Sequence, residues 1–183
     1  MGSKVAYCFV RNARNLTRMK DSPIQIKISG AAVPPSLPCP ALSISQRALL
    51  WRHFTLINKH PEITALMFYR NLFTIDPALQ ALFHTGMELQ AWKLMGALEF
   101  AIATLPNPAE LVPVLETLGR RHVVCGASAA HYTILMTAVM ETLRGMLGAE
   151  FTPEAENSWR EVLRFIHDAM LQGARGMRQL LNN

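Results

Sequence analysis

The sequence predicts an all-α fold, and three observations carry that prediction. Apolar residues recur every three or four positions in seven segments, which is the period of a helix with one buried face. No segment alternates apolar and polar residues with the period of a half-buried strand. Four prolines stand at the start of apolar segments, where the fixed φ of proline suits a first helical turn. A chain of 183 residues with 50% hydrophobic content can bury the core of one such domain.

The helices can be placed in order from these signals. We expect them over residues 44–58, 61–75, 77–82, 87–104, 108–124, 129–147 and 153–180. The second, third, fifth and seventh begin at Pro61, Pro77, Pro108 and Pro153. Ser128 and Thr152 are the expected N-caps of the last two helices, and Gly148 is expected to end the helix over 129–147.

Charge and proline content divide the chain near Ala41. Five of the 11 prolines lie in the first 40 residues, together with six basic residues and one acidic residue. From Ala41 onward, 12 basic residues balance 12 acidic residues. We therefore expect residues 1–42 to form a basic, proline-rich, flexible N-terminal extension and residues 43–183 to form the folded domain. Because the net charge of +5 comes from the extension, we expect no nucleic-acid partner for the domain.

The chain carries no sequence signal for a membrane or for export. No apolar run approaches the ~20 residues that cross a bilayer, and the opening residues lack a long apolar stretch followed by a small-residue cleavage site. The three cysteines are scattered and lack the CxxC spacing of a zinc site. We expect a cytoplasmic protein with no membrane span.

His122 is the first candidate for chemistry. An apolar stripe in the helix over 108–124 recurs at spacings of four and three residues and continues into His122; its members are Leu111, Leu115 and Leu118. The imidazole therefore points inward, as the leucines do. A lone histidine of this kind is more often a core residue with one hydrogen bond than a metal ligand. Its role depends on the polar residues of the other helices.

Two other helices each place one polar residue on an apolar face. Gln90 begins a face that continues through Leu94, Ala97, Leu98 and Ala101. Tyr69 shares the expected inward face of its helix with Leu66, Leu72 and Phe73. Either polar residue alone is more often structural. Together with His122 they favour an apolar cavity with an imidazole on one wall and a phenol and an amide opposite.

Such a cavity suits an iron porphyrin that binds a small gas. The imidazole of His122 provides a ligand to the iron, and Tyr69 and Gln90 donate hydrogen bonds to the gas. Phe83 follows the short third helix and is placed to lie flat on the macrocycle, although an aromatic residue there is more often part of the core. The chain has no CxxCH motif, so we expect haem b that is not covalently attached.

Four stretches carry a family resemblance. They are FYRNLF at 68–73, DPALQALF at 76–83, the pair Gln90 and Leu94, and LGRRHVVCGASAAHY at 118–132. Through them, residues 43–170 resemble the bacterial haemoglobins, both the single-domain proteins and the globin part of flavohaemoglobins. The resemblance implies a globin fold in which about seven helices pack around a haem pocket.

The resemblance also implies roles for individual side chains. We expect seven cofactor-binding residues: His122 as the proximal iron ligand, Tyr69 and Gln90 as distal hydrogen-bond donors, Leu94 as the distal apolar neighbour, Phe83 as the stacking ring, and Leu118 and Tyr132. His131 matches the first member of the family's His-Tyr pair, and we expect it to be structural rather than a competing ligand.

A network behind the proximal histidine departs from the family pattern. In flavohaemoglobins the tyrosine that matches Tyr132 joins a glutamate on the last helix, which makes the imidazole more basic. Here Leu163 replaces a family tyrosine, and no Asp or Glu occurs between Ala169 and Asn183. We therefore expect a neutral imidazole that donates less electron density to the iron.

Four functions follow in order of preference. The first is reversible binding of oxygen, with nitric oxide and carbon monoxide as other ligands. The alternative is a nitric oxide dioxygenase that depends on a separate reductase, because the chain ends at Asn183 without length for flavin and nicotinamide domains. A gas sensor that uses the basic extension and a haem-free regulatory domain are less favoured. The last conflicts with the joint presence of His122, Phe83 and the distal pair.

Overall fold

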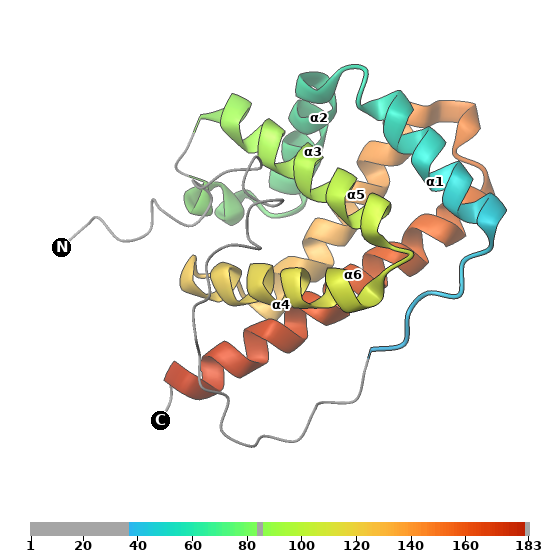
Figure 1. Cartoon of the computed structure of the whole chain (residues 1–183). Helices are drawn as coiled ribbons and strands as arrows, with labels where there is room; N and C mark the ends of the chain where they lie inside the picture. The colour runs from blue at the N-terminus through green and yellow to red at the C-terminus, as the bar shows by residue number, and fades with distance from the viewer. Residues whose placement is uncertain (1–36, 84–85, 182–183) are drawn as a thin grey trace.

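The computed structural model describes residues 37–83 and 86–181, so the expected extension lies almost entirely outside the described residues (Figure 1). These residues form α1 (Ile44–Ile57), α2 (Pro61–Ile75), the 3-10 helix η3 (Pro77–Leu82), α3 (Met87–Thr104), α4 (Pro108–Val124), α5 (Ala129–Leu147), the 3-10 turn η4 (Gly148–Glu150) and α6 (Pro153–Leu181). No strand occurs in the described ranges. The all-α prediction is confirmed, and each expected helix agrees with an observed one to within one residue at either end.

The helix ends follow the capping signals of the sequence. The hydroxyl of Thr152 accepts a hydrogen bond from the N–H of Ala155 at 3.3 Å, which caps α6. The ring Nδ1 of His131 accepts from the N–H of Ser128 at 3.2 Å, so this histidine helps to begin α5. Gly148 ends α5 with a φ of +53°, a left-handed conformation that costs glycine little.

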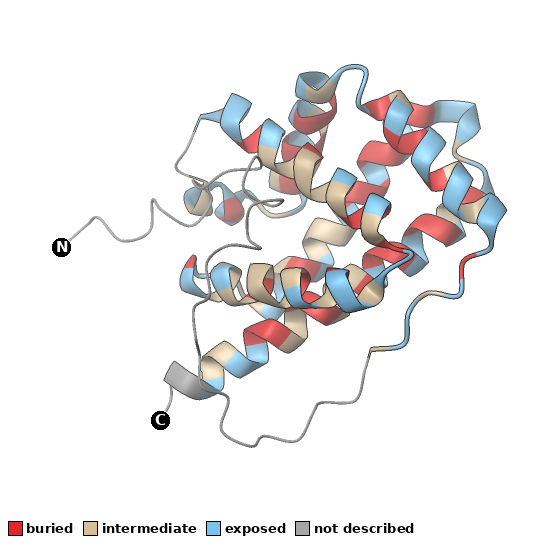
Figure 2. Cartoon of the chain, viewed as in Figure 1, coloured by how far each residue is buried: buried red, intermediate tan, exposed pale blue. Residues whose placement is uncertain are grey.

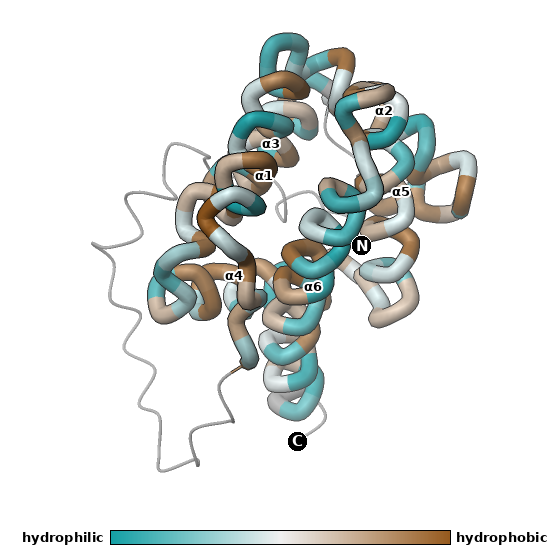
Figure 3. Tube along the Cα trace, turned by 90° about the vertical axis from the view of Figure 1, so that its right-hand side faces the viewer, coloured by the Kyte–Doolittle hydropathy of each residue, from teal (hydrophilic) through white to brown (hydrophobic). Residues whose placement is uncertain are grey.

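The helices pack around one core. α4 lies along α6, α2 packs against α5 and α3, and α1 packs against α6, α3 and α5 (Figure 1). Buried segments, red in Figure 2, recur along the helices, and hydrophobic and hydrophilic segments alternate along the tube in Figure 3. Fully buried core side chains include Leu50, Ile57, Leu72, Leu111, Leu143 and Trp159.

One expectation about α2 is wrong. Leu66 was expected on the inward face beside Tyr69, but 62% of its surface is exposed. The buried face is formed instead by Ala65, Phe68, Tyr69 and Leu72. Leu66 lies off the centre of that face because each residue turns the helix by about 100°.

Two glycines mark a close crossing of α4 and α6. A Cβ built on Gly119 would lie 1.9 Å from the carbonyl oxygen of Met170, and one on Gly173 would lie 2.0 Å from that of Glu116. Both neighbours are backbone atoms, so side-chain rotation cannot relieve the overlap. His122 follows Gly119 by one helical turn, and the crossing therefore fixes its turn of α4 against α6.

The described residues contain neither a membrane-spanning helix nor a metal-ligand cluster. No single described helix has the length and hydrophobicity of a membrane span. Taken together, α4 and the segment Ala129–Glu150 are long and apolar enough, but the two are bent by 116° relative to each other. Within the described ranges, no group of three or more His, Cys, Asp and Glu side chains is arranged to hold a metal ion.

A buried histidine outside the expected site joins α1 to α6. His53 is fully buried, and its Nδ1 accepts a hydrogen bond from Nε1 of Trp159 at 3.2 Å. Because Nδ1 accepts, the ring is neutral with its proton on Nε2. Burial lowers the pKa of His53; Glu150 opposes this effect, and the charge of Arg52 adds to it. Protonation would place a charge in the core and remove the acceptor that Trp159 uses.

The protein should therefore lose stability in acid through His53. Its pKa is lower in the folded state than in the unfolded chain, so the unfolded state binds more protons as the pH falls below about 6.5. We expect the free energy of unfolding to decrease from pH 6.5 downward and this slope to be smaller in His53→Gln. Denaturant titrations at several pH values measure it. His60→Gln, at an exposed histidine, should keep the wild-type slope; equal slopes for wild type and His53→Gln would refute the prediction.

Candidate haem pocket

His122 lies in the last turn of α4 with a defined tautomer. Its Nδ1 is 2.8 Å from the carbonyl oxygen of Leu118. A carbonyl only accepts, so Nδ1 carries the proton and the lone pair lies on Nε2. Burial lowers the pKa of His122, and the hydrogen bond to Leu118 opposes this only in part. The imidazole is therefore neutral, the form that binds metal ions.

Aromatic rings from two further helices form a chain of contacts that begins at His122. The ring centroid of Tyr132, on α5, lies 5.9 Å from that of His122 and 6.0 Å from that of His167 on α6. His167 in turn contacts Asp168, with Nδ1 and Oδ1 2.9 Å apart. Burial raises the pKa of Tyr132 to about 12 despite the nearby charge of Arg178, so the phenol stays protonated.

Tyr69 occupies the centre of a second aromatic cluster. The side chain is 3% exposed, and its ring centroid lies 5.0 Å from Phe68, 5.8 Å from Phe73 and 5.3 Å from Phe83. Burial strongly raises the pKa of Tyr69. Its hydroxyl is therefore a hydrogen-bond donor at every physiological pH.

α3 contributes a buried amide and a half-buried cation. Gln90 is 1% exposed, although a glutamine in a first helical turn often faces water. Leu94, one turn later, packs partly buried against the core. Lys93 lies between them, its Nζ is shielded from solvent, and burial lowers its pKa. Sequence reasoning missed Lys93, although its spacing of three from Gln90 signals a shared face.

The expected residues form two groups. Ring contacts join Tyr69 to Phe83 in one and His122 to Tyr132 in the other. Leu118 belongs to the second group through its carbonyl oxygen. Gln90 and Leu94 lie on α3, which packs against α2 and α4 and so connects the elements of both groups. Sequence reasoning also missed the His167–Asp168 pair, since nothing in the local pattern signals its contact with Tyr132.

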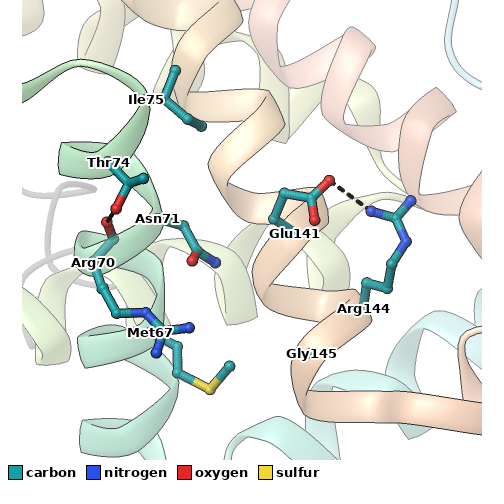
Figure 4. Close-up of a pocket in the computed structure, with 8 residues that line it drawn as sticks. All are labelled: Met67, Arg70, Asn71, Thr74, Ile75, Glu141, Arg144 and Gly145. Atoms are coloured by element: carbon teal, nitrogen blue, oxygen red, sulfur yellow. Dashed lines mark hydrogen bonds and ion pairs between the residues drawn. The ribbon is translucent and has the colours of Figure 1, made fainter.

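A surface groove of about 370 Å³ lies between α2 and α5, away from these residues (Figure 4). Met67, Arg70 and Asn71 line it from α2, and Arg144 and Glu141 face them from α5. Arg144 binds Glu141 at 2.7 Å and Glu156 at 3.2 Å, so its charge is neutralised. The groove contains none of the expected haem residues.

The donor set fits a haem. A neutral imidazole with its proton held on Nδ1 has the form that would bind a haem iron through Nε2, and the hydrogen bond to Leu118 fixes its orientation. Tyr69 and Gln90 are buried polar groups on elements with apolar neighbours, so each could donate a hydrogen bond inside an apolar pocket. Phe83 supplies a half-buried ring beside Tyr69.

Comparisons with known proteins find relatives of this chain among flavohemoproteins. Over 140 residues, 74% of its length, the chain is 28% identical to a flavohemoprotein of Bordetella parapertussis, of which it covers 35%. It is 32% identical over 119 residues to a flavohemoprotein of Bacillus cereus, covering 63% of this chain and 29% of that protein. The chain thus spans about a third of the length of these relatives.

Solved structures show the same fold. An engineered carbene transferase built on a protein described as a nitric oxide dioxygenase of Rhodothermus marinus superposes with a TM-score of 0.68 at 23% identity, covering 78% of this chain and 99% of that one. A hexacoordinated haem protein of an anhydrobiotic tardigrade superposes with a TM-score of 0.63 at 16% identity and the same coverage. The family model for globins matches residues 66–170. The chain belongs to the globin family.

Proposed function

We propose that the protein binds oxygen reversibly at a non-covalently held haem b whose iron is held by Nε2 of His122. The observation that carries the proposal is the 2.8 Å contact between Nδ1 of His122 and the carbonyl of Leu118. It selects the tautomer with the lone pair on Nε2 and orients the ring. The flavohemoprotein relatives, whose name denotes a haem protein, support the cofactor.

The other residues have separate roles in binding the haem and its gaseous ligand. When bound, the haem supplies an iron that takes oxygen, nitric oxide or carbon monoxide as ligand. Tyr69 and Gln90 donate hydrogen bonds to the gas, and Leu94 keeps that side apolar. Phe83 would lie against the macrocycle, and Leu118 and Tyr132 would hold His122 in place beside it.

Oxygen equilibrium and turnover measurements test this function against the alternative. Ferrous, haem-loaded protein should take up oxygen and release it on evacuation over several cycles, without a reductant. Absorption spectra follow each cycle. Conversion to ferric protein within the first cycle would contradict reversible binding.

Nitric oxide dioxygenation is the second candidate. It is favoured by the flavohemoprotein relatives and by the description of the Rhodothermus marinus protein. The reaction consumes one oxygen, one nitric oxide and one electron for each nitrate, so it needs a reductase as electron donor. Steady nitric oxide consumption with a supplied flavin reductase, at a rate set by reduction, would favour this activity. A single burst equal to the amount of haem would favour oxygen binding.

A further inference from the structure

The hydroxyl of Tyr132 is a buried polar group in the described part of the protein. The residue is 4% exposed, and no hydrogen-bond partner for its hydroxyl lies among the described residues. A buried hydroxyl without a partner loses its hydration and gains nothing in return. Such a group is retained where a small movement or a bound cofactor gives it a partner.

Two histidines flank the phenol. Their ring centroids lie 5.9 Å away for His122 and 6.0 Å away for His167, and the His167 ring meets that of Tyr132 edge-on at 80°. Nδ1 of His122 already donates to Leu118. His167 is therefore the flanking ring whose nitrogen can accept a hydrogen bond from the Tyr132 hydroxyl.

Asp168 determines which nitrogen of His167 can accept a hydrogen bond. Its Oδ1 lies 2.9 Å from Nδ1 of His167, and a carboxylate only accepts, so Nδ1 carries the proton. The lone pair then lies on Nε2, which makes that nitrogen an acceptor for a hydroxyl proton. Successive contacts lead from Asp168, on the half-exposed surface of α6, through His167 and Tyr132 to His122.

We propose that His167 and Asp168 are positioning residues for His122 that act through Tyr132. The Tyr132 hydroxyl donates to Nε2 of His167, and Asp168 accepts from Nδ1. The phenolic oxygen, made more electron-rich by this donation, supports the N–H side of His122 together with the Leu118 carbonyl. This inference rests on the proposed function, since it requires His122 to be the iron ligand.

The close packing of α4 on α6 limits the positions of α6 that can carry a side chain toward α4. Gly173 lies against the carbonyl oxygen of Glu116, and an added Cβ there would be 2.0 Å from it. Asp168 lies just before the acid-free segment 169–183, and its carboxylate contacts His167.

The test is the iron–histidine stretching frequency in resonance Raman spectra of ferrous, ligand-free, haem-loaded protein. Stronger hydrogen bonding at the imidazole N–H raises this frequency. We expect Tyr132→Phe, His167→Leu and Asp168→Asn each to lower it, and His167→Gln to restore part of the loss. Haem transfer to an acceptor protein should be about 10-fold faster in Asp168→Asn. Glu161→Gln removes the same charge from an exposed position of α6 and should change neither.

A double variant decides whether the effect passes through Tyr132. Asp168→Asn should add no further shift in the Tyr132→Phe background. An undiminished shift in that background would overturn the proposal, as would wild-type frequencies in both His167→Leu and Asp168→Asn. These outcomes are distinct from failure of the proposed function, which would appear as the absence of an iron–histidine band in wild type. Asp168→Asn and Tyr132→Phe keep the side-chain shape, and circular dichroism verifies their helix content.

Discussion

Replacing Gly119 with alanine is expected to lower the free energy of unfolding by about 3 kcal/mol, the upper part of the usual range for overpacking a core. The new Cβ would lie 1.9 Å from the carbonyl oxygen of Met170, and only separation of α4 from α6 can relieve that overlap. The same separation displaces the turn that carries His122. We therefore also expect weaker haem retention. Denaturant titration of the haem-free protein and haem transfer from the loaded protein measure the two effects.

Gly176 provides a matched control on the same helix. A Cβ added there meets no atom within 4 Å, and the residue is exposed. Gly176→Ala should therefore stabilise the protein by about 0.5–1 kcal/mol, the usual gain of alanine over glycine in a helix. Equal stability changes for the two variants would show that α4 and α6 do not touch as described.

Tyr69→Phe is expected to speed oxygen dissociation by roughly 10- to 100-fold. The variant removes only the hydroxyl, which burial keeps protonated and hence able to donate. A hydrogen bond to a ligand with negative charge contributes about 1.5–3 kcal/mol, which corresponds to that factor. Stopped-flow displacement of oxygen by carbon monoxide measures the rate.

Carbon monoxide serves as the internal control for this variant. It carries little negative charge when bound, so a hydrogen-bond donor stabilises it far less than oxygen. Its dissociation rate should change much less in Tyr69→Phe. A large and equal change for both gases would point to altered access to the pocket, and an unchanged oxygen rate would show that the phenol does not reach the ligand.

Local signals in the sequence predict most of the fold. Prolines such as Pro61 and Pro153 fix helix starts, and the cap at Thr152 acts within a few residues, so the bounds of the helices follow from short-range chemistry. The inward stripe ending in His122 also follows from spacing alone. Leu66 shows where this reasoning fails, because a hydrophobic residue at the edge of an apolar stripe can be either buried or exposed.

The contacts that tune the site are not readable from spacing. Gly119 and Met170 are 51 positions apart, and only the crossing of α4 and α6 brings them together. The approach of His167 to Tyr132 depends on the packing of α5 against α6. Lys93 is an intermediate case, since its spacing from Gln90 suggests a shared face but does not predict burial of its ammonium.

The central claim is that His122 holds the haem iron, and titration of His122→Gly with haem tests it most directly. We expect wild type to bind one equivalent of haem with the Soret absorption of a histidine-ligated iron. His122→Gly should lose this spectrum and regain it when free imidazole fills the vacated space. A variant that binds haem with the wild-type spectrum and the wild-type iron–histidine band, without imidazole, would contradict the claim.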